Sequence, residues 1–286
     1  MNIREFTEKI RAALAAALDR EVLPKETLKL NSVRRYGIVI VESDNSLSPI
    51  IYLEKLFEDY QKGRSLDAVL GSVISMYQQG RPQKTVSMEW IEHFDQARET
   101  VFYFLINYDA NQELLTQVPH FRYLDLAIVF GMKSGLENAP GTITVFNSHL
   151  DMWGITAEEL FPTAETNTPL LYPLQLSYMP DLVPGEQCPG HPGQMYVLTN
   201  TYHTYGAAAM CYRDALKGFS LLMGSDILLL PDSIHQMVLV PLKEGENPES
   251  YRDTVRSTNE NFTGISEFLS NSIYLYRRDA GEIETV

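Results

Sequence analysis

Apolar positions recur with helical spacing at the start of the chain. Residues 2–18 place an apolar side chain every three or four positions, which predicts an amphipathic helix with Ile3, Phe6, Ile10, Leu14 and Leu18 on one side. An alanine-rich stretch at 12–17 raises the helix propensity further. Two interpretations are open: the helix packs on its own lobe, or it joins a second copy of the chain in a homodimer through residues 2–18.

The remainder of the first 118 residues shows mainly helical patterns. Ser48-Pro49 suits a helix start, because Ser caps a first turn and Pro fits into it. The predicted elements are a strand at 36–41, helices at 49–63, 66–77 and 88–98, and a strand at 101–106. We therefore expect a mostly helical N-terminal lobe over residues 1–118.

Alternating apolar positions predict strands in the second part of the chain. The first elements are strands at 124–130 and 142–146, a helix at 157–165 and an irregular proline-rich stretch at 177–193. The last elements are strands at 194–199, 226–230, 235–241 and 272–276 with helices at 207–222 and 248–262. We expect Tyr251, Val255 and Phe262 to face inward from the last helix.

The order of the last elements is βαββαβ, which is typical of a ferredoxin-like unit. We predict an α+β fold in which an antiparallel or mixed sheet forms a C-terminal lobe over residues 119–286. One continuous domain is the alternative to two lobes.

The charge balance of the 286 residues is acidic, with 23 Lys and Arg against 37 Asp and Glu, a formal net charge of −14. Phosphate backbones and anionic membranes attract basic proteins, so this balance disfavours direct binding of nucleic acid or membrane. Such a charge mainly keeps a protein soluble. It also leaves open an acidic inhibitor that occupies the basic site of a nucleic-acid enzyme.

Cys188 and Cys211 are the two cysteines of the sequence, too few for a disulfide framework or a zinc knuckle. Charged residues such as Arg4, Glu5 and Glu8 interrupt the N-terminal region where a signal peptide needs an apolar core. With no apolar stretch long enough to span a membrane, the sequence predicts a cytoplasmic protein.

Sequence motifs of common enzymes are absent from the chain. We find no phosphate-binding GxxxxGK[ST], no GxGxxG after a strand, no GxSxG and no HExxH. Glycines stand mostly at helix ends, where they do not form a phosphate cradle. This favours a noncatalytic protein, and the sequence indicates no cofactor.

Polar residues nevertheless gather after two predicted strands. Asn147, His149 and Asp151 follow the strand at 142–146. His149 and Asp151 would share a face if this segment were extended, as a base and its orienting carboxylate or as metal ligands. The alternative is that Asn147 caps the next turn and His149 bonds to the backbone.

A second group, Asn200 and His203, precedes Gly206 and the helix that follows it. A third, Ser233 and His235, lies in the turn between two apolar strands. Together the three groups could form one site, although nothing in their spacing requires a metal. Tight helix-on-sheet packing around Gly206 is the structural alternative.

Several segments resemble a bacterial domain family of unknown function. They include the residues from Val145 to Gly154, Met195 to Asn200, Gly206 to Ala208, and Leu230 to His235. The resemblance covers most of the chain and implies an origin in gut-type anaerobes and their mobile elements, but no mechanism. Asp232 departs from the family pattern, where a serine is usual.

Three functional hypotheses follow from the sequence. The first is a noncatalytic cytosolic binding or regulatory protein that acts through a protein partner or a small ligand. The second is a hydrolase or metal-assisted enzyme that uses the His and Asp side chains at the strand ends. The third is the acidic inhibitor of a nucleic-acid enzyme.

Overall fold

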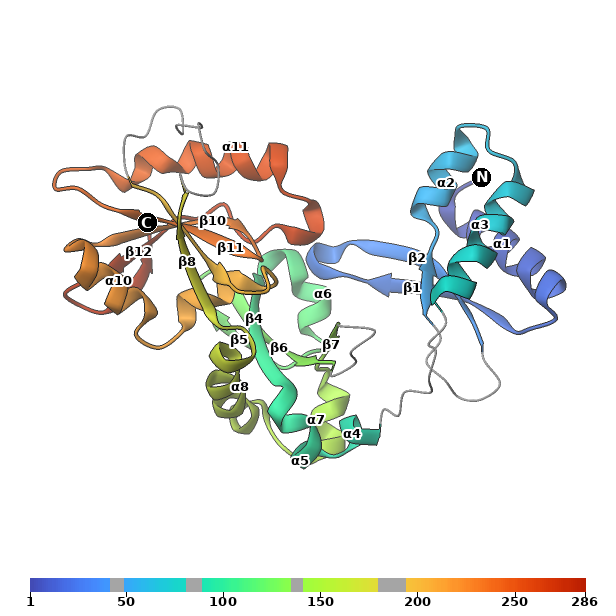
Figure 1. Cartoon of the computed structure of the whole chain (residues 1–286), viewed down its shortest axis with the longest axis horizontal. Helices are drawn as coiled ribbons and strands as arrows, with labels where there is room; N and C mark the ends of the chain where they lie inside the picture. Colours follow the sequence, from blue (N-terminus) through green and yellow to red (C-terminus); the bar gives the residue numbers. More distant parts are fainter. Residues whose placement is uncertain (42–48, 81–88, 135–140, 180–193) are drawn as a thin grey trace. The chain divides into compact units, whose positions relative to one another are not determined.

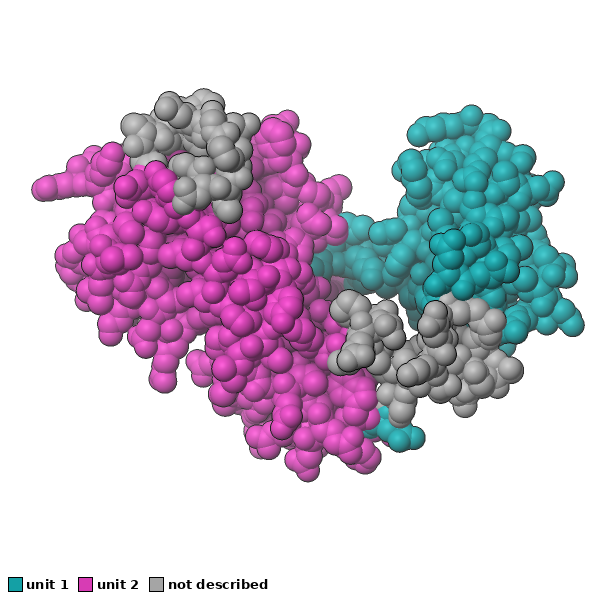
Figure 2. All heavy atoms as spheres, viewed as in Figure 1, with its two compact units in different colours: residues 1–89 teal, residues 90–286 magenta. Residues whose placement is uncertain are grey.

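The computed structural model of the chain describes residues 1–41, 49–80, 89–134, 141–179 and 194–286 (Figure 1). Its contacts divide the chain into two compact units, residues 1–89 and residues 90–286 (Figure 2). The sequence prediction placed a boundary after residue 118 instead. The two divisions differ because β4 (Val101–Asn107) pairs along its whole length with β6 (Leu126–Lys133), within the second unit.

The first unit packs three helices on one face of a three-stranded antiparallel sheet ordered β1-β2-β3 (Figure 1). Its elements are α1 (Ile3–Leu18), β1 (Val22–Leu28), η1 (Leu30–Ser32), β2 (Arg34–Ile40), β3 (Ile50–Tyr52), α2 (Glu54–Gln61) and α3 (Leu66–Gly80). The helix predicted from Ser48-Pro49 begins later, because residues 50–52 pair with β2 as a strand. Ser48 itself lies outside the described residues.

Helix α1 begins where the sequence predicts, and its apolar side faces the core of its own unit. Asn2 accepts a hydrogen bond from the Glu5 N–H at 2.9 Å, and Glu5 accepts one from the Asn2 N–H at 3.0 Å. This reciprocal cap satisfies two of the free donors at the helix start. Phe6, Ile10 and Leu14 are fully buried. A homodimer through residues 2–18 would therefore have to use the opposite, polar side of α1.

The second unit contains two antiparallel sheets. One is ordered β4-β6-β5 with β7 on the end of β6, and the other is ordered β13-β12-β10-β11-β9-β8. Its strands besides β4 and β6 are β5 (His120–Tyr123), β7 (Thr142–Thr144), β8 (Leu174–Tyr178), β9 (Tyr196–Asn200), β10 (Ile227–Ser233), β11 (Gln236–Pro241), β12 (Tyr274–Arg277) and β13 (Glu282–Thr285). The expected α+β class is confirmed by this combination of antiparallel sheets and helices.

Helices cover both sheets of the second unit. The α-helices are α4 (Glu89–Glu92), α5 (Phe94–Ala97), α6 (Gln112–Leu115), α7 (Asn147–Trp153), α8 (Ala157–Leu171), α10 (Ala215–Met223) and α11 (Arg252–Phe262). The 3₁₀ segments are η2 (Arg98–Thr100), η3 (Asp109–Asn111), η4 (Gly206–Cys211), η5 (Pro248–Tyr251) and η6 (Ile265–Glu267). Most of the irregular stretch expected at 177–193 lies outside the described residues, as does Cys188.

The predicted βαββαβ order is present from β9 to β12, but the ferredoxin-like arrangement is not confirmed. In that arrangement the fourth strand lies beside the first. Here β12 pairs with β10 instead, and β8 occupies the position beside β9. The difference arises because β8, a strand outside the predicted elements, takes the edge of β9.

The six-stranded sheet is covered on one face by α11 (Figure 1). Tyr251 and Val255 are buried there against strand residues such as Leu228 and Leu275. Phe262 was expected to face inward as well, but it is the last residue of the helix and is 85% exposed. Segment η4 contacts β9, β11 and β4, so it lies between the two sheets.

Side chains also join the two sheets directly. The Asp125 carboxylate, just before β6, accepts hydrogen bonds of 2.6 Å from the Tyr274 hydroxyl and 2.6 Å from the Ser270 hydroxyl. The Asn107 amide at the end of β4 donates to the Leu269 carbonyl at 2.9 Å. Satisfied polar networks of this kind rigidify the packing of the elements that they join. None of the helices in the described residues is long and apolar enough to cross a membrane.

Candidate functional site

Two of the three polar groups predicted from the sequence meet in the second unit. Strand β9 ends at Asn200, and the loop that follows leads into η4. In this loop, the Tyr205 N–H donates to His235 Nδ1 at 3.1 Å. The Thr199 hydroxyl donates to the His235 carbonyl at 2.8 Å. The groups around Asn200 and His235 therefore lie side by side, because β9 and β11 are neighbours in the sheet.

Asn200 shapes the loop rather than facing a ligand. Its buried side chain accepts from the Tyr202 N–H at 3.0 Å and donates to the Thr204 carbonyl at 2.7 Å. Such bonds satisfy the amide, and they let His203 and Tyr205 adopt positive φ values of 50° and 54°. His203 is exposed.

Gly206 permits the close approach of the two groups. A Cβ at this position would overlap the Thr199 hydroxyl and the His235 carbonyl, and it would lie 2.9 Å from the Asn200 nitrogen. Tight packing of η4 on the sheet, the structural alternative that the sequence left open, accounts for this glycine.

His235 is held through one ring nitrogen, Nδ1. Since Nδ1 accepts from a backbone N–H, the neutral ring carries its proton on Nε2, which lies 4.0 Å from Glu267 Oε1. Burial lowers the pKa of His235, and the Glu267 charge opposes that change. The Ser233 hydroxyl accepts from the His235 N–H at 3.2 Å. A general base needs an unprotonated nitrogen facing the substrate, and Nδ1 does not fit that role.

The third predicted group, at 147–151, has separate surroundings. This segment is the helix α7 and not an extended strand end, so His149 and Asp151 do not share a face. His149 Nδ1 accepts from the Phe146 N–H at 2.9 Å, and its ring stacks on Trp153 at 5.6 Å. Burial lowers the pKa of His149. Asp151 is exposed, while the Asn147 amide donates to the Thr116 carbonyl at 3.2 Å.

The structure thus brings two of the three groups into contact and gives the third its own partners. Among the described residues, no hydrogen bond, ion pair or ring contact joins 147–151 to 200–206 or to 233–235. In the same part of the chain, no group of three or more His, Cys, Asp or Glu side chains is placed to hold a metal ion.

A tyrosine–lysine cluster, formed by Lys133, Thr142, Tyr172, Tyr202 and Tyr205, lies next to His235. The Lys133 nitrogen is 3.9 Å from the centre of the Tyr202 ring and 4.9 Å from that of Tyr172, and it donates to the Leu171 carbonyl at 3.2 Å. Tyr205 stacks obliquely on Phe104 at 4.3 Å and on His235 at 5.9 Å. The cluster thus collects side chains from the four-stranded sheet, from the loop after β9 and from the end of α8.

The electrostatics of this cluster favour an anion. No carboxylate of the described residues is within ion-pair distance of Lys133, whose charge meets only ring faces and a carbonyl. Burial raises the pKa of Tyr172 and of Tyr205, and a hydrogen bond with Thr142 opposes the rise in both. Both hydroxyls stay protonated at neutral pH, and Tyr202 is 57% exposed beside them.

No local sequence pattern indicates this cluster. Lys133 ends an apolar strand and Tyr172 follows a helix, which are ordinary positions for a snorkelling lysine and a buried ring. Only Tyr202 and Tyr205 lie in a segment with candidate site residues, the one that contains Asn200 and His203. Their relation to Lys133 depends on the packing of one sheet against the other, which no local pattern encodes.

A comparison with protein families places this chain among known sequences. Residues 3–278 match the model described as "Family of unknown function (DUF5688)", so the chain belongs to that family. No curated protein and no solved structure matches the chain.

Proposed function

We propose that this member of a family of unknown function is a noncatalytic cytosolic binding or regulatory protein that takes a small anionic ligand at the tyrosine–lysine cluster. The supporting observation is the Lys133 ammonium, 3.9 Å from the Tyr202 ring and without a carboxylate partner among the described residues. An unpaired, half-buried cation gains more from an incoming anion than a solvated one, because less water screens it. The exposed Tyr202 side chain offers a flat surface on which an aromatic ring attached to the anion can stack.

The residues that an enzyme would use do not favour the catalytic alternative. His149 and His235 each accept a backbone N–H at Nδ1, and the third imidazole, His203, is exposed on a loop. Positions of this kind suit residues that stabilise turns. We therefore assign them structural roles and do not propose hydrolysis.

Adenosine monophosphate, inorganic phosphate and adenosine are suitable probes, because they separate the anion from the flat ring. A ligand that binds only the folded protein raises its stability, by about 2.7 kcal/mol at 100 times its Kd. We expect adenosine monophosphate to raise the melting temperature, phosphate to raise it less, and adenosine to leave it unchanged.

Lys133→Gln should abolish this shift. Lys217→Gln, which removes an exposed lysine of α10 in the same unit, should preserve it and serves as the matched control. Equal shifts in both variants, or no shift with either anion in the unmodified protein, would contradict the proposed site. Calorimetric titration of the same probes then gives the affinity.

A further inference from the structure

The outer half of the β1–β2 hairpin is a bare two-stranded ribbon. The third strand, β3, pairs only with Gly37–Val39 of β2. Beyond these residues, Glu26–Leu28 of β1 pair with Arg34–Tyr36 of β2, and neither segment pairs with another strand in the described part of the chain. We call residues 25–36 the basic arm. Both faces of this arm are open to solvent to some degree, since none of its residues is buried.

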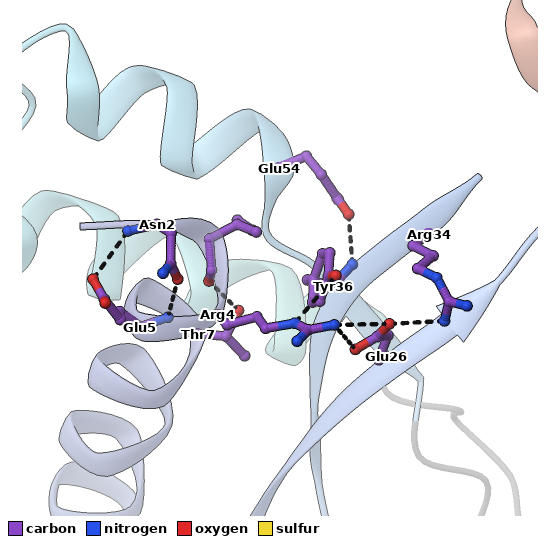
Figure 3. A network of polar contacts seen from close by, with 9 residues as sticks. Asn2, Arg4, Glu5, Thr7, Glu26, Arg34, Tyr36 and Glu54 are labelled. Atoms are coloured by element: carbon purple, nitrogen blue, oxygen red, sulfur yellow. Dashed lines mark hydrogen bonds and ion pairs between the residues drawn. The ribbon is translucent and has the colours of Figure 1, made fainter. Parts of the chain in front are cut away.

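One face of the basic arm carries a tyrosine between two arginines (Figure 3). Tyr36 stands directly across from Glu26 in the ladder. The Arg4 guanidinium, from α1, lies 5.6 Å from the centre of the Tyr36 ring and 3.2 Å from the Glu26 carboxylate. Arg34 reaches the same carboxylate at 2.9 Å. The Glu26 carboxylate therefore contacts two guanidinium groups on this face.

The opposite face repeats this composition. The Tyr52 ring, at the end of β3, lies 4.4 Å from the Arg35 guanidinium and 5.2 Å from the Lys29 nitrogen. Arg35 is 3.1 Å from Glu54, whose other oxygen accepts from a backbone N–H of β2. Lys29 and the exposed Lys25 have no carboxylate within ion-pair distance among the described residues.

The acidic charge of the whole chain is not shared equally by its two units. Of the 23 Lys and Arg residues, 13 lie in residues 1–89, together with 12 of the 37 Asp and Glu residues. Residues 90–286 hold the remaining 10 basic and 25 acidic residues. The acidity that disfavours nucleic acid therefore belongs to the second unit. Charge asymmetry between the parts of a chain is itself an indicator of an anionic partner.

We propose that the basic arm inserts into the major groove of double-stranded DNA and contacts the phosphates on both of its sides. The major groove of B-DNA is wide enough for a two-stranded antiparallel ribbon. A groove presents phosphates to both faces of an inserted ribbon, which matches cations on both faces of the arm. A flat acidic protein surface would contact only one face of the arm. This inference is independent of the ligand site in the second unit.

Fluorescence anisotropy of a labelled mixed-sequence duplex of about 20 base pairs, with the full chain at about 50 mM KCl, tests the proposal. The double variant Lys25→Gln/Lys29→Gln removes two arm cations that hold no carboxylate. The matched control, Lys9→Gln/Lys62→Gln, removes two exposed lysines from the helical side of the same unit.

We expect the full chain to bind the duplex with an affinity that falls as salt rises. The arm variant should bind about tenfold more weakly, and its plot of log affinity against log salt concentration should be less steep by the equivalent of about two phosphate contacts. The control variant should bind as the unmodified chain does. Absence of duplex binding, or an equal loss in both variants, would overturn the proposal. Competition by polyglutamate as effective as that by unlabelled duplex would assign the arm to an acidic protein partner instead. Circular dichroism of each variant shows that the fold is retained.

Discussion

Single residues in this chain show how polar side chains can resemble a catalytic site while stabilising the backbone. His149 and His235 lie far apart in sequence, yet each imidazole accepts an N–H at Nδ1, and Asn200 closes its own loop. Each bond satisfies a donor or acceptor where regular pairing ends. Polar residues after a strand therefore mark a turn that needs hydrogen bonds as readily as they mark a reactive centre.

Replacing Gly206 with alanine should destabilise the second unit by about 1–3 kcal/mol, the usual cost of forcing extra volume into a packed site. The new methyl group would overlap the Thr199 hydroxyl and the His235 carbonyl, both held by the sheet. Urea denaturation followed by circular dichroism measures the loss. Gly218→Ala is the control: apart from its chain neighbours and the backbone of its own helix, nothing lies within 4 Å of the added Cβ, so this variant should be neutral or slightly more stable.

At this scale the sequence predicted part of the candidate site. The groups at Asn200 and His235 lie together because their strands are neighbours, a relation that sequence analysis could only suppose. The group at 147–151 lies apart, because a helix replaced the expected extended segment. No sequence pattern marked Lys133 as a candidate site residue, since its partners Tyr172 and Tyr202 come from segments whose packing depends on the whole unit.

Whole elements followed the sequence where their apolar pattern was strong. The first helix, the long helix at 66–80 and the βαββαβ order all have clear periodicity, and all are present. Strands β1 and β13 were missed because they lie at sheet edges and contain few buried residues, so their sequences lack an apolar run. The missed β8 also changed the strand order, which local propensity cannot reveal.

The connection between the two sheets of the second unit can be tested at Asp125. Asp125→Asn should lower the free energy of unfolding by about 1.5–3 kcal/mol, since a charged acceptor that serves two hydroxyls becomes neutral. Both bonds, from Tyr274 and from Ser270, measure 2.6 Å. Denaturation by urea, monitored by tryptophan fluorescence, gives the difference.

Asp151→Asn provides the control for this measurement, because that carboxylate is exposed on α7. Its stability should stay within about 0.5 kcal/mol of the unmodified protein, as for most surface substitutions. If Asp125→Asn fell in the same range, the two hydroxyl bonds would not hold the sheets together.

The whole molecule consists of two units with separate cores. The core of the first, from Phe6 to Tyr77, draws only on residues 1–80, and no residue of the second unit belongs to it. A segment with its own core and its own helix caps has what independent folding requires. Function can therefore reside in each unit separately, as the two proposals above assume.

Fragments 1–80 and 89–286, produced separately, should each unfold cooperatively and give dispersed amide spectra. The expected melting temperatures are within a few degrees of the transitions in the full chain, since each unit has its own core and unfolds as a cooperative element of its own. A fragment 1–80 that remains unfolded in solution would show that its core needs the rest of the chain.

The position of β1 at the edge of its sheet has a consequence for the behaviour of the protein at high concentration. An open edge strand is a template on which a second copy can add its own strand, and this leads to fibres. Strand β1 counters this risk with Pro24, which has no N–H to offer, and with the neighbouring charges of Lys25 and Glu26. The same features that kept β1 from being recognised as a strand thus protect the exposed ribbon from aggregation.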